Sequence, residues 1–261
     1  MPLRRFFSVR RDAPRGVEGW RAYVVGDVHG CLDALDALLA QIVADHEARV
    51  PERALLVFLG DLIDRGPASA QVVERVRTLA LPGVKVVTLA GNHEEVLLKI
   101  LDGEQSRIEG WLKFGGAETL ASYGVDPGQV AALPPGPAQE MIAAAIPSAD
   151  RQFLQSLGDT FRFGDYLFVH AGLRPGLPLS EQSAKDLRWI REPFLSDPRD
   201  HGMTVVHGHT ITETVDERAN RIGIDTGAYR TGCLTALAIE GEERWFLATE
   251  PASFPLEKQF V

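Results

Sequence analysis

The sequence is short of cysteine, of long apolar runs and of positive charge. Its two cysteines, Cys31 and Cys233, form no Cys-x-x-Cys pair, which argues against a thiolate zinc site. We expect two reduced thiols in the core and a cytoplasmic location. No run of about 18 apolar residues occurs, so we expect no transmembrane helix. With 27 Lys and Arg against 36 Asp and Glu, the formal net charge is −9, and polyanionic nucleic acids and membranes are not expected partners.

The length and composition favour one large domain. A chain of 261 residues with 45% hydrophobic content can bury a sizeable core, and we predict a single domain over 1–261. Residues 1–20 start with a basic segment that has no apolar h-region behind it, so they do not fit a signal peptide. We predict a loosely docked N-terminal arm there, and docking of anionic partners by this arm is the alternative.

The first hundred residues alternate between buried-strand and helical patterns. Each of the three apolar runs at 21–25, 54–59 and 84–89 is followed by a glycine-containing loop and then by helical spacing, over 31–50, about 67–80 and about 94–101. This alternation is typical of parallel βαβ units. From about 102 to 157 the pattern predicts a helical insertion that covers one side of the site, with Trp111, Phe114 and Tyr123 as packing residues. Short strands with more antiparallel pairing are expected after residue 160.

Polar residues with metal-binding chemistry follow the ends of these runs. The segments are GDVHG with Asp27 and His29, GDLIDRGP with Asp61, Asp64 and Arg65, GNHE with Asn92, His93 and Glu94, VHAG with His170, and VHGHT with His207 and His209. Ligands of parallel α/β sheets bind at the carboxyl ends of the strands. Mixed oxygen and imidazole donors suit Mn²⁺, Fe or Zn²⁺, and Asp61 can bridge two ions through its two oxygens. Two ions about 3.5 Å apart can generate hydroxide and clamp a phosphoryl group.

These five segments resemble the signature blocks of the calcineurin-like metallophosphoesterases, and most closely the bacterial members of the phosphoprotein (serine/threonine) phosphatase branch. The blocks span 26–210, and the Asp-Arg-Gly of the second block is the more specific part. The resemblance implies an α/β fold, a two-sheet αββα sandwich with a helical cap insertion. It also implies a hydroxide that bridges two metal ions and attacks phosphorus in line, without a phosphoenzyme.

The resemblance also implies the two ligand sets. The first ion would take Asp27, His29 and Asp61, and the second would take Asp61, Asn92, His170 and His209. Many superfamily members carry a further histidine ligand where this chain has Ile211, which leaves water at the first ion. His207 is expected to be structural or to lie behind a ligand. Mn²⁺ is the expected metal, with Fe, Zn²⁺ and Ni²⁺ as alternatives, since the donors suit all of them.

The remaining site residues have expected roles in proton transfer and phosphate binding. His93, next to Asn92, would protonate the leaving oxygen, and Asp64 would orient and charge its ring. Arg65 would bind two phosphate oxygens. The resemblance adds Arg191 as a second arginine, with Arg174 and Arg188 as competitors. It also places Tyr229 near the site and leaves Asp225 structural or behind a ligand. Glu94 is expected only to favour the helix dipole.

The sequence therefore predicts a metal-dependent phosphomonoesterase and, more specifically, a serine/threonine protein phosphatase. Its partners would be a phosphorylated protein, a phosphopeptide or a small phosphate ester. Two alternatives remain. Symmetrical diadenosine tetraphosphate hydrolases share most of the blocks but usually lack the aspartate equivalent to Asp64, so a nucleotide hydrolase is the first. A metal-binding scaffold without catalysis is the second.

Overall fold

Two five-stranded sheets form the centre of the protein in a computed structural model that describes residues 13–50 and 52–250. The first sheet has the order β10-β9-β1-β2-β3. Its strands are β1 (Trp20–Val25), β2 (Arg53–Phe58), β3 (Val84–Thr88), β9 (Thr235–Glu240) and β10 (Glu243–Ala248). The three strands from the N-terminal half pair in parallel, while β9 is antiparallel to both β1 and β10. The two halves of the chain are thus joined within one sheet.

The second sheet comes entirely from the C-terminal half, with the order β4-β5-β6-β8-β7. Its strands are β4 (Thr160–Phe163), β5 (Tyr166–Val169), β6 (Thr204–His207), β7 (Asp216–Glu217) and β8 (Arg221–Gly223). The pairs β5–β6 and β6–β8 are parallel, and the two outer pairs are antiparallel. In each sheet the carboxyl ends of the parallel strands therefore lie at one edge, where ligands bind in such sheets.

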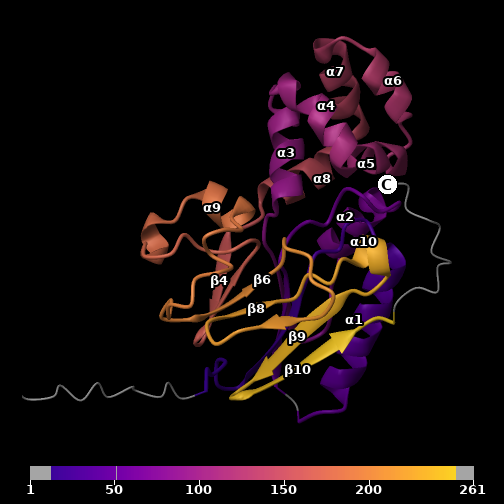
Figure 1. The fold of residues 1–261 in the computed structure, drawn as a ribbon. Helices are drawn as coiled ribbons and strands as arrows, with labels where there is room; N and C mark the ends of the chain where they lie inside the picture. The colour runs from indigo at the N-terminus through magenta and orange to yellow at the C-terminus, as the bar shows by residue number, and fades with distance from the viewer. Residues whose placement is uncertain (1–12, 51, 251–261) are drawn as a thin grey trace, which may run out of the picture.

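Helices cover the outer faces of both sheets. Those before β4 are α1 (Leu32–Glu47), α2 (Ser69–Arg77), α3 (Asn92–Leu101), η1 (Gln105–Arg107), α4 (Ile108–Trp111), η2 (Leu112–Gly116), α5 (Ala117–Ser122), α6 (Pro127–Ala132), α7 (Pro135–Ala145) and α8 (Ser148–Gln155). Those after β5 are η3 (Leu179–Glu181), α9 (Ala184–Trp189) and α10 (Ala228–Thr231). Figure 1 shows α3 to α8 gathered at one end of the molecule, beyond the edges of the sheets.

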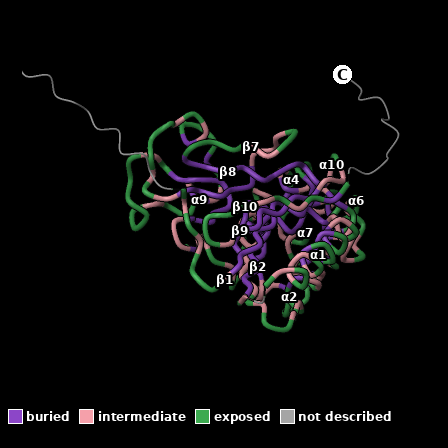
Figure 2. The backbone as a smooth tube through the Cα atoms, turned by 90° about the horizontal axis from the view of Figure 1, so that it is seen from below, coloured by how far each residue is buried: buried purple, intermediate pink, exposed green. Residues whose placement is uncertain are grey.

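Three apolar clusters hold these layers together. One lies between the sheets, where Val24, Val57 and Leu237 meet Phe168 and Ile222. A second joins the outer face of the first sheet to α1, α2 and the insertion, and a third joins the outer face of the second sheet to α9. In Figure 2 the buried part of the chain runs through the strands, with exposed loops around it. Because buried apolar area is the main favourable term in folding, these clusters fix the loops that carry the polar motifs.

The two-sheet αββα sandwich with helices over 102–157 is confirmed, while several predicted boundaries move by one to three residues. The second helix begins at Ser69 rather than at Pro67, and the third begins at Asn92. The short strand β7 was not predicted. It pairs two residues with β8, too few for an alternating pattern to show. Residues 1–12 of the proposed N-terminal arm lie outside the described residues. In the remainder of the arm, Arg15 N donates to Asp165 Oδ2 at 2.9 Å.

Two further expectations from the sequence concern membrane-spanning helices and the cysteine thiols. Among residues 13–50 and 52–250, no helix combines the length and apolarity that a membrane span requires. Cys31 and Cys233 are both free, as predicted, and both are half-buried, with Cys31 packed against the core. Burial nevertheless raises the pKa of the Cys31 thiol to about 11, which keeps it protonated and unreactive at neutral pH.

Candidate metal centre

The polar motifs converge at one end of the strands in both sheets. The contributing loops follow β1 (Asp27, His29), β2 (Asp61, Asp64), β3 (Asn92), β5 (His170) and β6 (His209). Three of these strands belong to the first sheet and two to the second. The site is therefore a product of the sandwich, since neither sheet alone carries the full set.

Asp61 lies in the middle of this set. Ligand atoms of His29, Asp61 and His93 all lie within 4.8 Å of one another, and so do those of Asp61, His170 and His209. Asp61 Oδ2 is 3.5 Å from His29 Nε2 and 3.4 Å from His170 Nε2. Asp61 thus belongs to both groups, as expected of a carboxylate that bridges two ions.

Asp27 and Asn92 complete the predicted donor set at its margins. Asp27 lies in neither tight group, but its Oδ2 accepts a hydrogen bond from His209 N at 2.9 Å. A Cβ added to Gly208 would lie 2.0 Å from Asp27 Oδ1, so only glycine allows this approach. Asn92 Oδ1 is 3.0 Å from His170 Nε2. The structure thus brings together all six residues predicted as metal ligands.

The second ring nitrogen of two histidines fixes their orientation. His29 Nδ1 lies 2.8 Å from the carbonyl oxygen of Ile63, and His170 Nδ1 lies 3.0 Å from that of Leu59. A carbonyl oxygen only accepts, so Nδ1 carries the hydrogen in both rings. Each Nε2 then faces Asp61, as in metal-binding histidines whose other nitrogen is held by the backbone.

Burial tunes the charges of these groups. It lowers the pKa of His29 to about 3, and that of His209 falls well below its usual range for the same reason. Both rings are therefore neutral, which metal ligation requires. Burial would raise the pKa of Asp61, but the charges of His170 and His93 outweigh it and hold that pKa well below its usual range. Asp61 is thus an ionised carboxylate among imidazoles.

Several buried polar atoms at this site have no hydrogen-bond partner. They indicate whether the residues fit a metal ion. Within residues 13–50 and 52–250, seven buried side-chain nitrogen or oxygen atoms have no hydrogen-bond partner. Four of them belong to the site: Asp27 Oδ1, His29 Nε2, His209 Nε2 and Asp225 Oδ2. Such atoms are costly unless something binds them, and oxygen and imidazole donors fit divalent ions of the Mn²⁺, Fe and Zn²⁺ class.

The backbone is strained at several residues of the site. The non-glycine residues with positive φ in the described chain are His29 (46°), Asp61 (48°), Asp64 (71°), Arg65 (71°) and His209 (62°). A left-handed conformation costs an L-residue about 1–2 kcal/mol, and such strain gathers at functional sites. The sequence gives no sign of it, because none of these residues is glycine.

Glu94 is the main residue whose role the sequence analysis missed. Its buried carboxylate accepts hydrogen bonds from Asp61 N and Gly91 N at 2.9 and 2.8 Å, and from Leu62 N and Ile63 N at 2.7 and 3.3 Å. It therefore holds the Asp61 loop against the start of α3, beyond any effect on the helix dipole. Burial and then the charge of Asp61 raise the pKa of Glu94, although the N–H donors oppose this.

His93 and Asp64 form a buried pair beside Asp61. His93 Nδ1 lies 2.6 Å from Asp64 Oδ2, and His93 N donates to Asp61 Oδ1 at 3.1 Å. Burial would lower the pKa of His93, but the nearby charges of Asp61 and Asp64 outweigh it, and the pKa is raised. The ring is thus favoured in the protonated form that can donate to a leaving oxygen.

The helical insertion supplies further partners to Asp64. Trp111 Nε1 donates to Asp64 Oδ1 and Oδ2 at 3.1 and 3.0 Å, and Thr119 Oγ1 donates to Oδ1 at 2.6 Å. Trp111 is a packing residue as predicted, buried in the core cluster, and its indole N–H in addition binds the carboxylate that contacts His93. Phe114, with 71% of its surface exposed, is not a packing residue. Tyr123 donates to Asp150 at 3.1 Å and is half-buried.

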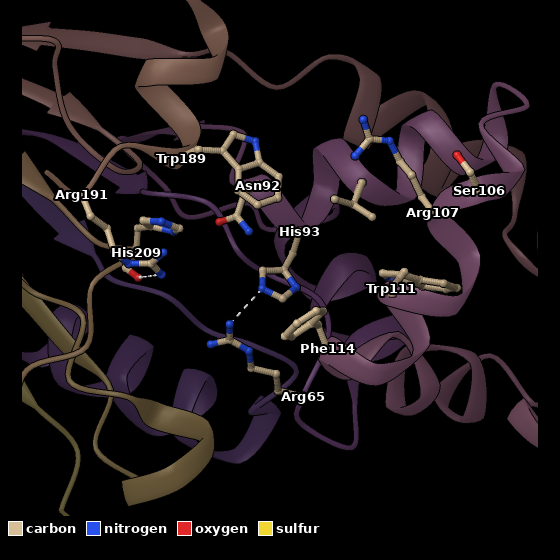
Figure 3. A pocket seen from close by; sticks show the side chains of 12 residues that line it. Arg65, Asn92, His93, Ser106, Arg107, Trp111, Phe114, Trp189, Arg191 and His209 are labelled. Carbon is tan, nitrogen blue, oxygen red and sulfur yellow. Dashed lines mark hydrogen bonds between the residues drawn. The ribbon is translucent and has the colours of Figure 1, made fainter.

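A pocket of about 500 Å³ opens beside His93. Its lining includes Arg65, Asn92, His93, Trp111, Phe114, Trp189, Arg191 and His209. In Figure 3 Arg191 lies beside His209, Arg65 and Phe114 lie beside His93, and Trp189 stands on the other side of His93 from Phe114. The pocket therefore brings arginine side chains near the candidate ligands together with aromatic side chains.

The arginines differ in their freedom to bind phosphate. Arg174 is paired with Asp186, and Arg188 is paired with Asp159 and Glu95. Arg191 instead lines the pocket, with Nη2 3.5 Å from the carbonyl oxygen of His209. Among the three candidates for the second phosphate-binding arginine, Arg191 is the one that lies at the site.

Arg65 lies between His93 and Tyr229. Its Nη2 is 3.1 Å from His93 Nε2, and its guanidinium carbon is 4.8 Å from the centre of the Tyr229 ring. When His93 is protonated, both Nη2 and Nε2 are donors, so Arg65 would turn to a phosphate oxygen. The Tyr229 ring also lies 5.4 Å from that of His29, which places it at the edge of the site.

His207 and Asp225 lie behind the ligands named so far. His207 Nδ1 is 3.0 Å from the carbonyl oxygen of Gly208 and its Nε2 is 3.3 Å from Arg221 Nη1. Both of its nitrogens are thus occupied, in keeping with a structural role. Asp225 Oδ1 accepts from Gly227 N at 2.9 Å, while Oδ2 has no partner.

The fold and these donors define a class of hydrolases that bind metal ions at the edges of two packed sheets. The profile of the calcineurin-like phosphoesterase family matches residues 21–231, and the chain belongs to this family. One curated relative is the symmetrical bis(5'-nucleosyl)-tetraphosphatase of Yersinia pestis (strain Pestoides F). It is 47% identical over 81 residues, which are 31% of this chain and 25% of the relative. The match thus spans a quarter of that enzyme.

Solved structures of similar fold carry different activities in their names. A putative diadenosine tetraphosphatase has a TM-score of 0.62 at 23% identity, covering 87% of this chain and 93% of that one. A cold-active protein-tyrosine phosphatase from a Shewanella species has a TM-score of 0.55 at 18% identity, with 89% and 83% covered. A serine/threonine phosphatase from Saccharomyces cerevisiae has 0.52 at 14%, with 94% and 86% covered. At these identities the likeness supports the fold alone.

The contact of Trp111 with Asp64 gives a first test. Trp111→Phe keeps an aromatic ring but removes the donor, so Asp64 should hold His93 less firmly. A neutral-to-charged hydrogen bond of about 1.5 kcal/mol corresponds to about tenfold in rate. We expect kcat for a phosphoserine peptide to fall by that order, with KM and metal content near those of the parent. Trp245→Phe is the control, because the Trp245 indole N–H has no partner; equal losses in both variants would contradict the role of Trp111.

The four donors around Glu94 give a second test. Glu94→Gln leaves one acceptor oxygen and brings an NH₂ group among backbone N–H donors. We expect a loss of about 3 kcal/mol in the free energy of unfolding, since buried groups are left unsatisfied. Urea denaturation would measure it, with exposed Glu118→Gln as the control. A loss no larger than that of the control would refute the anchoring role.

Proposed function

We propose that the protein is a phosphomonoesterase that uses two divalent metal ions, Mn²⁺ in the first instance, with Fe, Zn²⁺ or Ni²⁺ as alternatives. Asp27, His29 and Asp61 would hold one ion, and Asp61, Asn92, His170 and His209 the other. When bound, the ions would activate a water molecule for in-line attack and stabilise charge on the phosphoryl oxygens. Family membership and the shared position of Asp61 in two donor groups support this.

The observation that carries the proposal is the His93–Asp64 pair next to Asp61. A general acid must lie within reach of the leaving oxygen and must be protonated at working pH. His93 lines the pocket and binds Asp64 through Nδ1, which leaves Nε2, 3.1 Å from Arg65 Nη2, as the ring nitrogen for a leaving group. The protonated ring would donate from Nε2 to the departing alkoxide. Asp64 would keep the ring oriented and stabilise its charge throughout the step.

Arg65 and Arg191, which both line the pocket, would bind the phosphate dianion. A guanidinium offers two parallel N–H donors, which match two phosphate oxygens. The two side chains come from the loop after β2 and the segment after α9, and both line the pocket. They would hold the ester with its leaving group directed toward His93.

For the substrate we propose phosphorylated side chains of proteins or peptides, as in the serine/threonine phosphatase branch, or small phosphate esters. A phosphomonoester needs one proton for its leaving group, and the His93–Asp64 pair provides it. We also propose a cytoplasmic location and no nucleic-acid or membrane partner, on the basis of the two thiols and the net charge of −9.

A nucleotide hydrolase is the second candidate. The match to a symmetrical bis(5'-nucleosyl)-tetraphosphatase and the exposed Phe114 and Trp189 beside the pocket favour it, because aromatic rings can stack on bases. A scaffold without catalysis is a weaker candidate, since it would not need the His93–Asp64 pair.

Phosphate release by metal-stripped protein, with and without added Mn²⁺, tests the function. The substrates are p-nitrophenyl phosphate, a phosphoserine peptide and diadenosine tetraphosphate. We expect Mn²⁺-dependent hydrolysis of the first two and slower cleavage of the third. Faster cleavage of diadenosine tetraphosphate would favour the nucleotide candidate. If folded, metal-loaded protein hydrolysed no ester, the proposal that the protein is an enzyme would be refuted.

His93→Asn separates proton donation from metal binding. We expect kcat to fall by about 10²- to 10⁴-fold, the usual contribution of a general acid, while the content of Mn²⁺ stays near that of the parent. Metal analysis of the variant measures the second quantity. The hydrolysis of an ester with a good leaving group, such as p-nitrophenyl phosphate, should slow less than the hydrolysis of a phosphoserine peptide. Parallel loss of metal and rate would contradict the assignment.

A further inference from the structure

Asp225 is a buried carboxylate with one unused oxygen. It follows β8 in the second sheet and is 1% exposed. Its Oδ1 accepts a hydrogen bond from Gly227 N at 2.9 Å, which caps the turn that follows. Its Oδ2 is buried and has no partner. The turn therefore accounts for one oxygen of Asp225 and leaves the other without a function.

The loop of Asp225 packs against the loops that carry Asp27 and His209. Ile224 N donates to His207 O at 2.9 Å, and Thr212 N donates to Asp225 O at 3.0 Å. On the other side, a Cβ added to Gly26 would lie 2.5 Å from Ile224 O. Asp225 is thus fixed by backbone contacts between the two segments that supply the candidate ligands.

The charge of Asp225 has a larger effect on Asp27 than the charge of Asp61 has. Asp27 Oδ1 and Asp225 Oδ2 are both buried without a partner. Two such carboxylates repel each other and are stable together only with a proton or a cation.

We propose that Asp225 is a further carboxylate ligand of the metal ion held by Asp27 and His29. This rests on the dinuclear centre of the proposed function and adds a residue to it. With Asp225, three carboxylates face the pair of ions, where Asp27 and Asp61 alone would supply two. The added oxygen favours a hard ion such as Mn²⁺ in the site of Asp27, compared with the imidazole-rich site of His170 and His209.

Binding of Mn²⁺ to the metal-stripped full chain, measured by equilibrium dialysis with metal analysis, tests the proposal. Asp225→Asn keeps Oδ1 as the acceptor for Gly227 N and removes the charge. We expect two bound ions in the parent, and in the variant a Kd for one ion raised by at least about tenfold, the smallest loss seen for residues that support a ligand. The other ion should bind as in the parent.

Two controls separate ligation from folding. Asp150→Asn changes an equally buried aspartate that binds Arg77 and Tyr123 away from the site, and it should keep both ions. Asp61→Asn should weaken both ions, as the bridging position requires. Asp225→Glu keeps the charge but lengthens the side chain, so it should retain more Mn²⁺ affinity than Asp225→Asn, whereas a turn cap alone would favour Asn.

The outcomes distinguish this proposal from the function it rests on. Two ions bound to Asp225→Asn with parental Kd values would overturn the ligand role of Asp225, whatever the activity of the parent. A parent that binds two ions but hydrolyses no ester would refute the proposed function and leave the ligand test valid. A parent that binds fewer than two ions would overturn both.

Discussion

The burial of the Asp61 carboxylate between the two sheets is the constraint on which the rest of the site depends. A buried charge is unstable unless opposite charges or donors surround it. Here His93 and His170, whose Nε2 atoms lie 4.0 and 3.4 Å from Asp61 Oδ2, supply the positive charge. They follow strands of the first and the second sheet, respectively. The balance of charge at Asp61 therefore links the packing of the sandwich to the chemistry, because displacing either sheet would leave the carboxylate without partners.

The backbone around Asp61 is held in place by Glu94. Four N–H groups of the Asp61 loop and of Gly91 converge on one carboxylate, and several neighbouring residues adopt left-handed conformations. Such strain persists only where surrounding contacts over-determine it. The Glu94 contacts and the close approach of Gly91 to Asp61 supply that determination. A second buried negative charge so near the first is one more reason why a cation at the site would stabilise the fold.

What the sequence predicted, and what it did not, follows from the range of the contacts. The βαβ units and the six candidate ligands are local features, a short apolar run followed by a motif, so a single segment reveals each of them. Trp111 binds Asp64 from 47 positions away, and Glu94 binds the loop 31–33 positions before it. A tryptophan in an amphipathic segment has the same pattern whether its N–H is used or not, and an acidic residue at a helix start already has a sufficient local explanation. Only the folded arrangement distinguishes these roles.

The insertion therefore supplies contacts within the candidate site as well as a wall of the pocket. Trp111 and Thr119 bind Asp64, and Arg65 N donates to the carbonyl oxygen of Gly115, next to the exposed Phe114. In the proposed function, Phe114 of the pocket and the partners of Asp64 belong to the same short segment of helices. A substrate that displaced Phe114 would act on the Gly115–Arg65 contact, and through it on the loop that carries Asp64. Substrate binding and the proposed proton transfer would in this way be connected through the cap.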